Sequence, residues 1–172
     1  MLKKIFLSFF LLFLLKTENV FSQENEALFV DSLLENGHFF EAAIAFERII
    51  FEAKNEETDL KTNALLKKSY AYKSLKNFEA AKTALYRIPL QNYGDSVQLL
   101  VRYEIALNAF LNKEFGEAES QFVQLNYFLK DKKLLETTWF LQILTLNELK
   151  RWDEAKVLLE KYLEKHKMLQ QN

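Results

Sequence analysis

The chain has 172 residues, of which 49% are apolar, so it has enough material for the core of a single domain. Three glycines and one proline are too few turn formers for a hairpin-rich β fold, and this scarcity predicts an all-α protein. The 23 basic and 24 acidic residues are scattered along the chain, which argues against nucleic acid as a partner. Cysteine is absent, which excludes disulfides, thiolate catalysis and cysteine metal sites.

Residues 1–22 have the three-part layout of a secretory signal peptide. Two lysines precede an apolar run at 5–15, and Val20 and Ser22 occupy the −3 and −1 positions for cleavage after Ser22. As a helix the run covers about 16 Å, well short of a hydrocarbon core of roughly 30 Å. The pattern predicts export to the periplasm or cell envelope, with an uncleaved membrane anchor as the alternative. The junction "VFSQ" also resembles signal peptides of Bacteroidota.

An aromatic residue followed three positions later by alanine occurs four times in the rest of the chain. Large apolar residues stand four and seven positions after each alanine, so all four side chains fall on one face of a helix. An alanine fixed in such a face lets a second backbone approach closely, and we interpret these residues as structural. The four pairs, whose alanines are 39, 37 and 37 residues apart, are Phe39/Ala42, Phe78/Ala81, Phe115/Ala118 and Trp152/Ala155.

A second helical pattern precedes each motif, and Gly37 lies where the first of these helices needs a left-handed C-cap. A regular period of this length with two helices in each repeat predicts an α-solenoid. We expect a signal peptide at 1–22, a repeat domain at 23–166 and a short polar tail at 167–172. The repeats are expected at about 26–54, 58–89, 95–129 and 131–166, and the preceding helices at Glu26–Glu35, Asp59–Leu75, Ser96–Asn112 and Lys132–Leu149.

These repeats resemble the tetratricopeptide repeat family over about residues 26–166. The best single repeat is 65–85, with small Ser69 and aromatic Tyr72 where the family places such residues. The period is longer than the family's, which is about 34 residues, and Val30 and Ile143 replace the small residue in the first and fourth repeats. The resemblance implies a right-handed solenoid of about four antiparallel helix pairs with a role in binding proteins or peptides.

No catalytic constellation is legible in the sequence. His38 and His166 are far apart and lack carboxylates at helical spacing, so we interpret both as solvated. No phosphate-binding glycine loop, nucleophile elbow or calcium loop occurs. The many carboxylates alternate with lysines, as on solvated helix faces. The sequence therefore predicts no enzymatic activity, no metal site and no cofactor.

The family resemblance implies that the first helix of each pair lines a concave groove. An aromatic and apolar groove of this kind suits an extended or helical peptide with apolar anchors. Alternatively, some of these side chains are buried between helices. Counting back from each alanine gives the expected lining as Leu66, Tyr70, Lys73, Tyr103, Leu107, Phe110, Phe140, Leu144 and Asn147.

The expected function is that of an exported, non-enzymatic scaffold for a protein or peptide partner of unknown identity. The alternatives are a membrane-tethered assembly subunit with an uncleaved anchor, and a carrier for a hydrophobic small molecule. The last helix carries Val157, Leu158 and Leu163 beside its motif, with no capping helix after it. That arrangement predicts either self-association through this helix or cover by the stems of neighbouring charged side chains.

Overall fold

The computed structural model describes residues 28–54 and 56–170, with side chains described through Glu164. This part of the chain is helical and contains no strand, which confirms the all-α prediction. A 3₁₀ turn occupies Leu90–Asn92. The helices, in order, are the segment 28–35, α2 (Phe39–Glu52), α3 (Thr58–Ser74), α4 (Phe78–Tyr86), α5 (Asp95–Leu111), α6 (Phe115–Phe128), α7 (Lys132–Glu148) and α8 (Trp152–Gln170).

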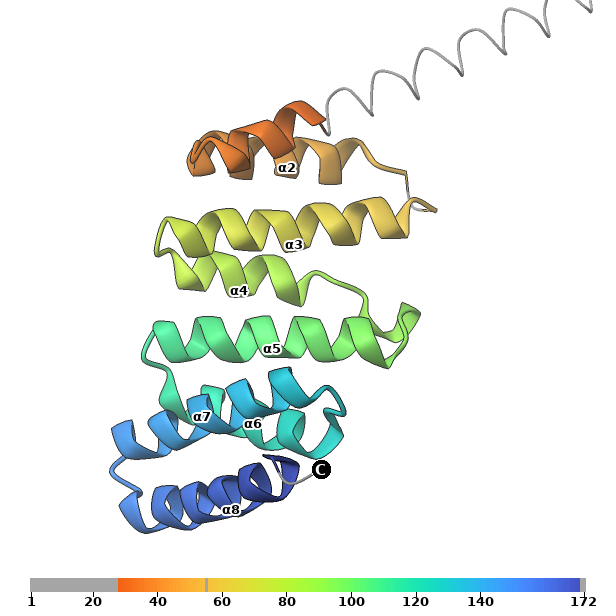
Figure 1. Ribbon diagram of the computed structural model, residues 1–172. Helices are drawn as coiled ribbons and strands as arrows, with labels where there is room; N and C mark the ends of the chain where they lie inside the picture. The colour runs from red at the N-terminus through yellow and green to blue at the C-terminus, as the bar shows by residue number, and fades with distance from the viewer. Residues whose placement is uncertain (1–27, 55, 171–172) are drawn as a thin grey trace, which may run out of the picture.

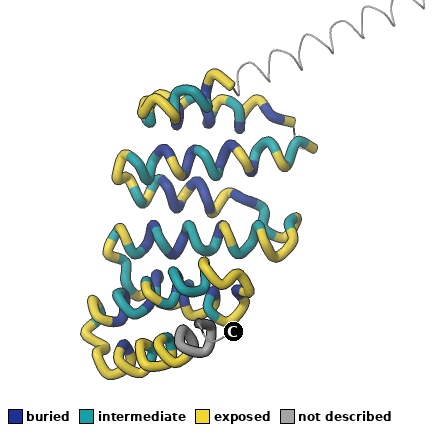
Figure 2. Tube along the Cα trace, in the orientation of Figure 1, coloured by how far each residue is buried: buried dark blue, intermediate teal, exposed yellow. Residues whose placement is uncertain are grey.

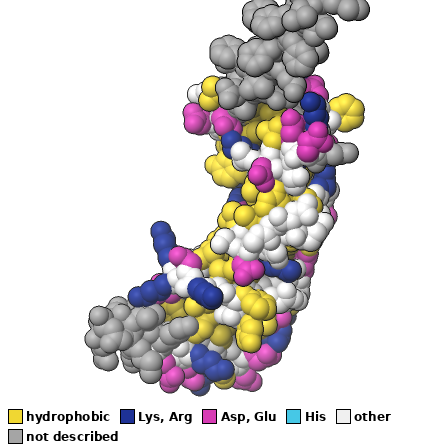
Figure 3. Space-filling model, turned by 90° about the vertical axis from the view of Figure 1, so that its right-hand side faces the viewer, with side chains coloured by type: hydrophobic (Ala, Val, Ile, Leu, Met, Phe, Trp, Pro, Cys, Tyr) yellow, Lys and Arg dark blue, Asp and Glu magenta, His cyan; other side chains and the backbone are white. Residues whose placement is uncertain are grey.

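The helices form four antiparallel pairs that stack in chain order (Figure 1). We call the segment 28–35, α3, α5 and α7 the first helices, and α2, α4, α6 and α8 the second helices. From α2 onward, each helix packs mainly against its neighbours in sequence, as in a solenoid, and the stack is curved along its length (Figure 3). The expected bounds of α3, α5 and α7 agree within one residue. The last helix continues to Gln170, into the segment that was assigned to a tail.

The turn inside each pair has the same backbone geometry in all four repeats. One residue, two positions before the motif aromatic, has a left-handed φ: Gly37 at 78°, Lys76 at 59°, Lys113 at 64° and Lys150 at 59°. In the third turn, the Glu114 amide donates to the Ala109 carbonyl and the Lys113 amide to that of Phe110, at 2.9 and 3.0 Å. The other three turns have the equivalent bonds, so each first helix ends in a Schellman motif.

We expect Lys113→Gly to raise the free energy of unfolding by about 0.5–1 kcal/mol, because glycine removes the clash of a Cβ at left-handed φ. Urea denaturation followed by the helical circular dichroism signal measures this change. The control is Lys161→Gly on an exposed face of α8, where the same substitution should cost about 1 kcal/mol. Equal destabilisation by both substitutions would contradict the assignment of strain to the turn.

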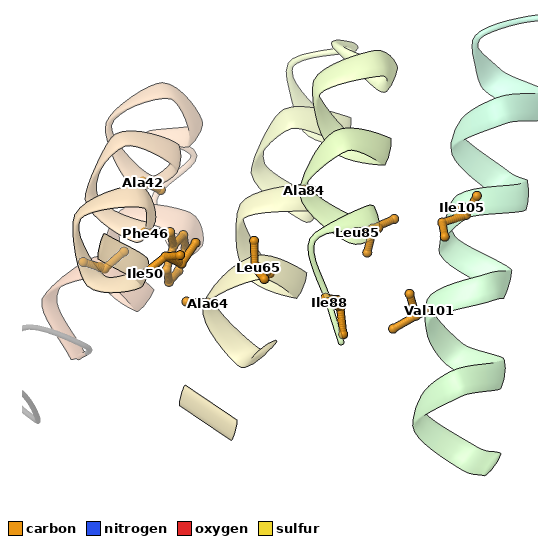
Figure 4. Packing of buried hydrophobic residues seen from close by; sticks show 11 residues of the cluster. Ala42, Phe46, Ile50, Ala64, Leu65, Ala84, Leu85, Ile88, Val101 and Ile105 are labelled. Carbon is orange, nitrogen blue, oxygen red and sulfur yellow. The ribbon is translucent and has the colours of Figure 1, made fainter. Parts of the chain in front are cut away.

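The apolar core is divided into two clusters along the stack. The N-terminal cluster joins α2 to α5 and includes Phe46, Leu85 and Ile105, and Figure 4 shows its side chains filling the space between successive helices. The C-terminal cluster is centred on α5, α6 and the start of α7, with Phe122 fully buried. Buried residues occur on the inner faces of the helices in both halves (Figure 2). The motif alanines Ala42, Ala81, Ala118 and Ala155 are all buried.

The fourth motif differs from the other three in burial. Phe39, Phe78 and Phe115 are half-buried, whereas Trp152 is 64% exposed. The sequence interpretation gave all four aromatic residues the same role in holding helices together. In the described structure no further pair packs against α8, whereas the Phe39 ring packs edge-on against Tyr70 of the following pair.

Candidate functional site

The nine predicted groove residues are three equivalent positions on each of α3, α5 and α7. They are separated by the 37-residue period, so each position recurs at the same place on three stacked helices. Each set of equivalent positions forms a row across the three helices. The first row contains one leucine and two aromatic residues, the second contains one tyrosine and two leucines, and the third contains a lysine, a phenylalanine and an asparagine. The rows are Leu66/Tyr103/Phe140, Tyr70/Leu107/Leu144 and Lys73/Phe110/Asn147.

The structure leaves these residues exposed to different degrees. Tyr70 and Phe140 are 51% and 56% exposed, and Asn147 is also exposed. The other six are partly buried. Two aromatic rings, one near each end of the predicted surface, are therefore accessible to a partner.

Tyr103 and Phe110 belong partly to the core. Both pack against the C-terminal cluster, and the Phe110 ring meets the Phe115 ring edge-on with centroids 5.8 Å apart. Burial, assisted by the neighbouring Glu104 charge, raises the pKa of Tyr103. Leu66 packs similarly against the N-terminal cluster. These three residues thus fit the alternative reading of the sequence, in which part of the predicted lining packs between helices.

Ion pairs join consecutive first helices across this face. Lys73 of α3 lies 2.5 Å from the Glu104 carboxylate of α5, and its Nζ lies 5.9 Å from the centre of the Tyr70 ring. Lys67 of α3 reaches Asp31 of the segment 28–35 at 2.7 Å. These two pairs link α3 to the segment 28–35 on one side and to α5 on the other.

A second set of charges connects consecutive second helices. Glu47 of α2 pairs with Arg87 at the end of α4 at 2.8 Å, and with Lys68 of α3 at 2.5 Å. In the last step, Glu119 of α6 lies 3.7 Å from Arg151, the residue that precedes α8. These charges were interpreted from the sequence as solvated. Their partners are 21 to 40 residues away in the chain, and local sequence contains no signal for such pairs.

Lys82 of α4 is the centre of the largest of these charge clusters and is only 5% exposed. Its ammonium group donates to Glu114 and Glu117 at the start of α6 and lies 3.3 Å from Glu79 in its own helix. Tyr86, one turn further along α4, donates its hydroxyl to the other oxygen of Glu117. One buried cation thus holds three carboxylates.

The pKa values in this cluster follow from burial and hydrogen bonding together. Burial opposes the charge on Glu117, but hydrogen bonds from Tyr86 and Lys82 outweigh burial and hold the pKa of Glu117 below its ordinary value. Burial alone would lower the pKa of Lys82, but its hydrogen bonds to Glu114 and Glu117 outweigh this effect and raise that pKa above its ordinary value. Burial and the bond to Glu117 raise the pKa of Tyr86 to about 12. All of these groups keep their ordinary charge at neutral pH.

A cleft of about 760 Å³ opens where α5 begins and α6 meets α7. Its walls are mixed: Leu99, Phe128 and Leu134 are apolar, whereas Asp95 and Lys130 bring charge. The Arg102 guanidinium, also in the wall, donates to the Gln124 side chain at 3.3 Å. Sequence reasoning missed the cleft, because its walls come from three helices and the connection between α6 and α7. Leu100, which precedes the predicted groove residue Tyr103 by one turn of α5, also belongs to the wall.

Nothing in the described part of the chain forms a metal site of three or more His, Asp or Glu side chains. His38 is exposed in the first turn, and His166 lies beyond the described side chains. Among the described helices, none combines the length and the apolar character needed to cross a membrane. No protein-family model matches the chain, and no curated protein matches it significantly.

Proposed function

We propose that this protein is an exported, non-enzymatic scaffold of the tetratricopeptide type, which binds a protein or peptide in the cell envelope through its first helices. The observation that carries the proposal is the pair of accessible rings, Tyr70 of α3 and Phe140 of α7, on the first helices. Ion pairs tie α3 to the segment 28–35 and to α5. Aromatic residues on a rigid, pre-organised surface are frequent anchors of binding energy.

The surface favours a peptide with apolar anchors over an acidic segment. Lys73, the one cation among the nine predicted residues, is already paired with Glu104. Leu107 lies on α5, the first helix between those of the two rings, and Leu144 lies one turn from Phe140 on α7; both leucines are partly buried. A peptide lying across the first helices would place apolar side chains on Tyr70 and Phe140, and the cleft at Leu100 would accept a further side chain.

Export is proposed from the sequence of residues 1–22, which lie outside the described part of the structure. N-terminal sequencing of the protein recovered from the envelope tests this part. A start at Gln23 supports export with cleavage, whereas a start at Met1 supports the membrane-tethered alternative.

We expect the double substitution Tyr70→Ala/Phe140→Ala to weaken partner binding by at least about tenfold, because hot-spot aromatic residues contribute strongly to affinity. Partners are captured from native envelope extract and identified by mass spectrometry, and binding of the identified partner is then titrated. The control is Tyr127→Ala/Phe51→Ala, which removes the same two residue types from second helices, where they are 83% and 87% exposed. Retention of the partner by the first variant and loss by the second would move the binding surface to the second helices.

A further inference from the structure

The last described helix keeps the apolar stripe of an internal helix, although no described pair packs against its outer side. Leu159 of α8 is equivalent to Phe46, Leu85 and Phe122, which the following pair buries to 3%, 1% and 0% exposure. Leu159 itself is 42% exposed, and Leu163, one turn further on, is 46% exposed. The capping helix of a solenoid ordinarily has a polar outer face, whereas α8 exposes these two leucines beside its charged residues.

The other end of the stack presents the matching half of the same contact. Leu85 of α4 faces Ile105 of α5 (Figure 4), so position 105 is where a first helix meets the pair before it. The equivalent residue in the segment 28–35, two repeats earlier, is Phe29, which is 60% exposed. The two ends of the described stack therefore expose equivalents of the two apolar residues, Leu85 and Ile105, that meet between the second and third pairs.

The two ends also carry opposite charges at the positions that correspond to the Lys82–Glu117 ion pair between the second and third pairs. Lys156 of α8 is equivalent to Lys82, and Glu41 of α2 is equivalent to Glu117, which pairs with Lys82 at 2.9 Å. Both Lys156 and Glu41 are exposed.

Between the third and fourth pairs the same region also pairs charges, with the signs reversed at two positions. Glu119 is equivalent to Lys82, and its partner Arg151 is equivalent to Glu114. Charge pairing at this place is thus a feature of both later steps, and the two free ends continue it.

We propose that copies of this protein associate head to tail, with α8 of one copy packed against the segment 28–35 and α2 of the next. In this contact Leu159 meets Phe29, and Lys156 pairs with Glu41 across the interface. The proposed contact has the same geometry as the contact between the second and third pairs. It would bury apolar surface at both ends of the stack and place opposite charges together. Because the two surfaces differ, the association is heterologous and produces chains longer than a dimer when the rotation does not close.

Sedimentation velocity over a concentration series tests the proposal, using untagged protein purified from cells that express the full chain. The wild type is expected to grow beyond the dimer as its concentration rises. Leu159→Glu and Phe29→Glu should each be monomeric alone, and an equimolar mixture should form a 1:1 dimer and nothing larger. A wild type that stays monomeric, or a dimer that Phe29→Glu leaves intact, would overturn the proposal, the latter in favour of an α8-to-α8 contact.

A charge exchange provides a second test at two exposed positions, where misfolding is not a concern. Lys156→Glu and Glu41→Lys should each weaken association by at least about tenfold through like-charge contact, and the double variant should recover it. Lys161→Glu, on another exposed position of α8, serves as the matched control and should leave association unchanged. Failure of the double variant to recover association, with each single variant folded by circular dichroism, would disprove the register.

Discussion

Phe122→Ala is expected to lower the free energy of unfolding by about 3–5 kcal/mol, the largest effect of any single substitution considered for this chain. Phe122 of α6 is fully buried in the C-terminal cluster, which is formed by the third helix pair and by α7 of the fourth. Truncation removes most of the ring and leaves a cavity that the helices around it can only partly close. Urea denaturation, followed by circular dichroism at low protein concentration, measures the loss.

The repeats supply a matched control for this substitution. Leu159 occupies the equivalent position in α8 but is 42% exposed, so Leu159→Ala should cost about 1 kcal/mol or less. If both substitutions lowered the free energy of unfolding by a similar amount, the outer face of α8 would be buried in solution to the same degree as that of α6. The comparison therefore also reports on the outer face of the last helix.

Lys82→Met is expected to lower the free energy of unfolding by about 1–3 kcal/mol. Methionine retains the apolar stem, but it leaves Glu79, Glu114 and Glu117 without their shared cation. Removing one partner of a fully buried ion pair costs about 3–5 kcal/mol, and we expect less here because solvent reaches the three carboxylates. The control is Lys156→Met at the equivalent exposed position, which should change stability by no more than about 0.5 kcal/mol.

The same cluster predicts how the difference between wild type and Lys82→Met depends on pH. The lowered pKa of Glu117 contributes stability that is fully present above its ordinary value of 4.5 and is lost as pH falls through the folded value. The raised pKa of Lys82 contributes stability that is fully present below 10.5 and is lost as pH rises through the folded value. The difference should thus be largest between pH 4.5 and 10.5 and should shrink on both sides. A difference that is constant from acid to alkaline pH would show that Lys82 acts through packing alone.

The architecture was largely predictable because it depends on short-range periodicity. The spacing from Phe78 to Ala81 and on to Leu85 defines a helix face within two turns, and repetition of that pattern indicates stacking. The left-handed turn was predicted at Gly37, where glycine marks it. It was not predicted at Lys76, Lys113 and Lys150, because lysine carries no local signal for that conformation.

The candidate surface was only partly predictable, because burial depends on which neighbour covers a residue. Tyr103 and Tyr70 have the same amino-acid type on equivalent faces of neighbouring helices, but only Tyr103 packs against a core cluster. Nothing in the sequence indicated the cluster around Lys82, since its partners Glu114 and Glu117 lie more than 30 residues away. Tertiary contacts at that range are not encoded in helical spacing.

The reversal of sign between Lys82 and Glu119 makes the order of the helix pairs chemically specific. If the third pair were duplicated in tandem, Glu119 would face a second Glu114 and a second Glu117, and three carboxylates would meet without a cation. If the third pair were deleted, Lys82 would face Arg151 and Glu154 in place of Glu114 and Glu117, so a cation would replace one of its two carboxylate partners on the next pair. Pairs with nearly identical backbones are therefore not interchangeable modules, and unequal recombination between their coding segments would be penalised at the new junction.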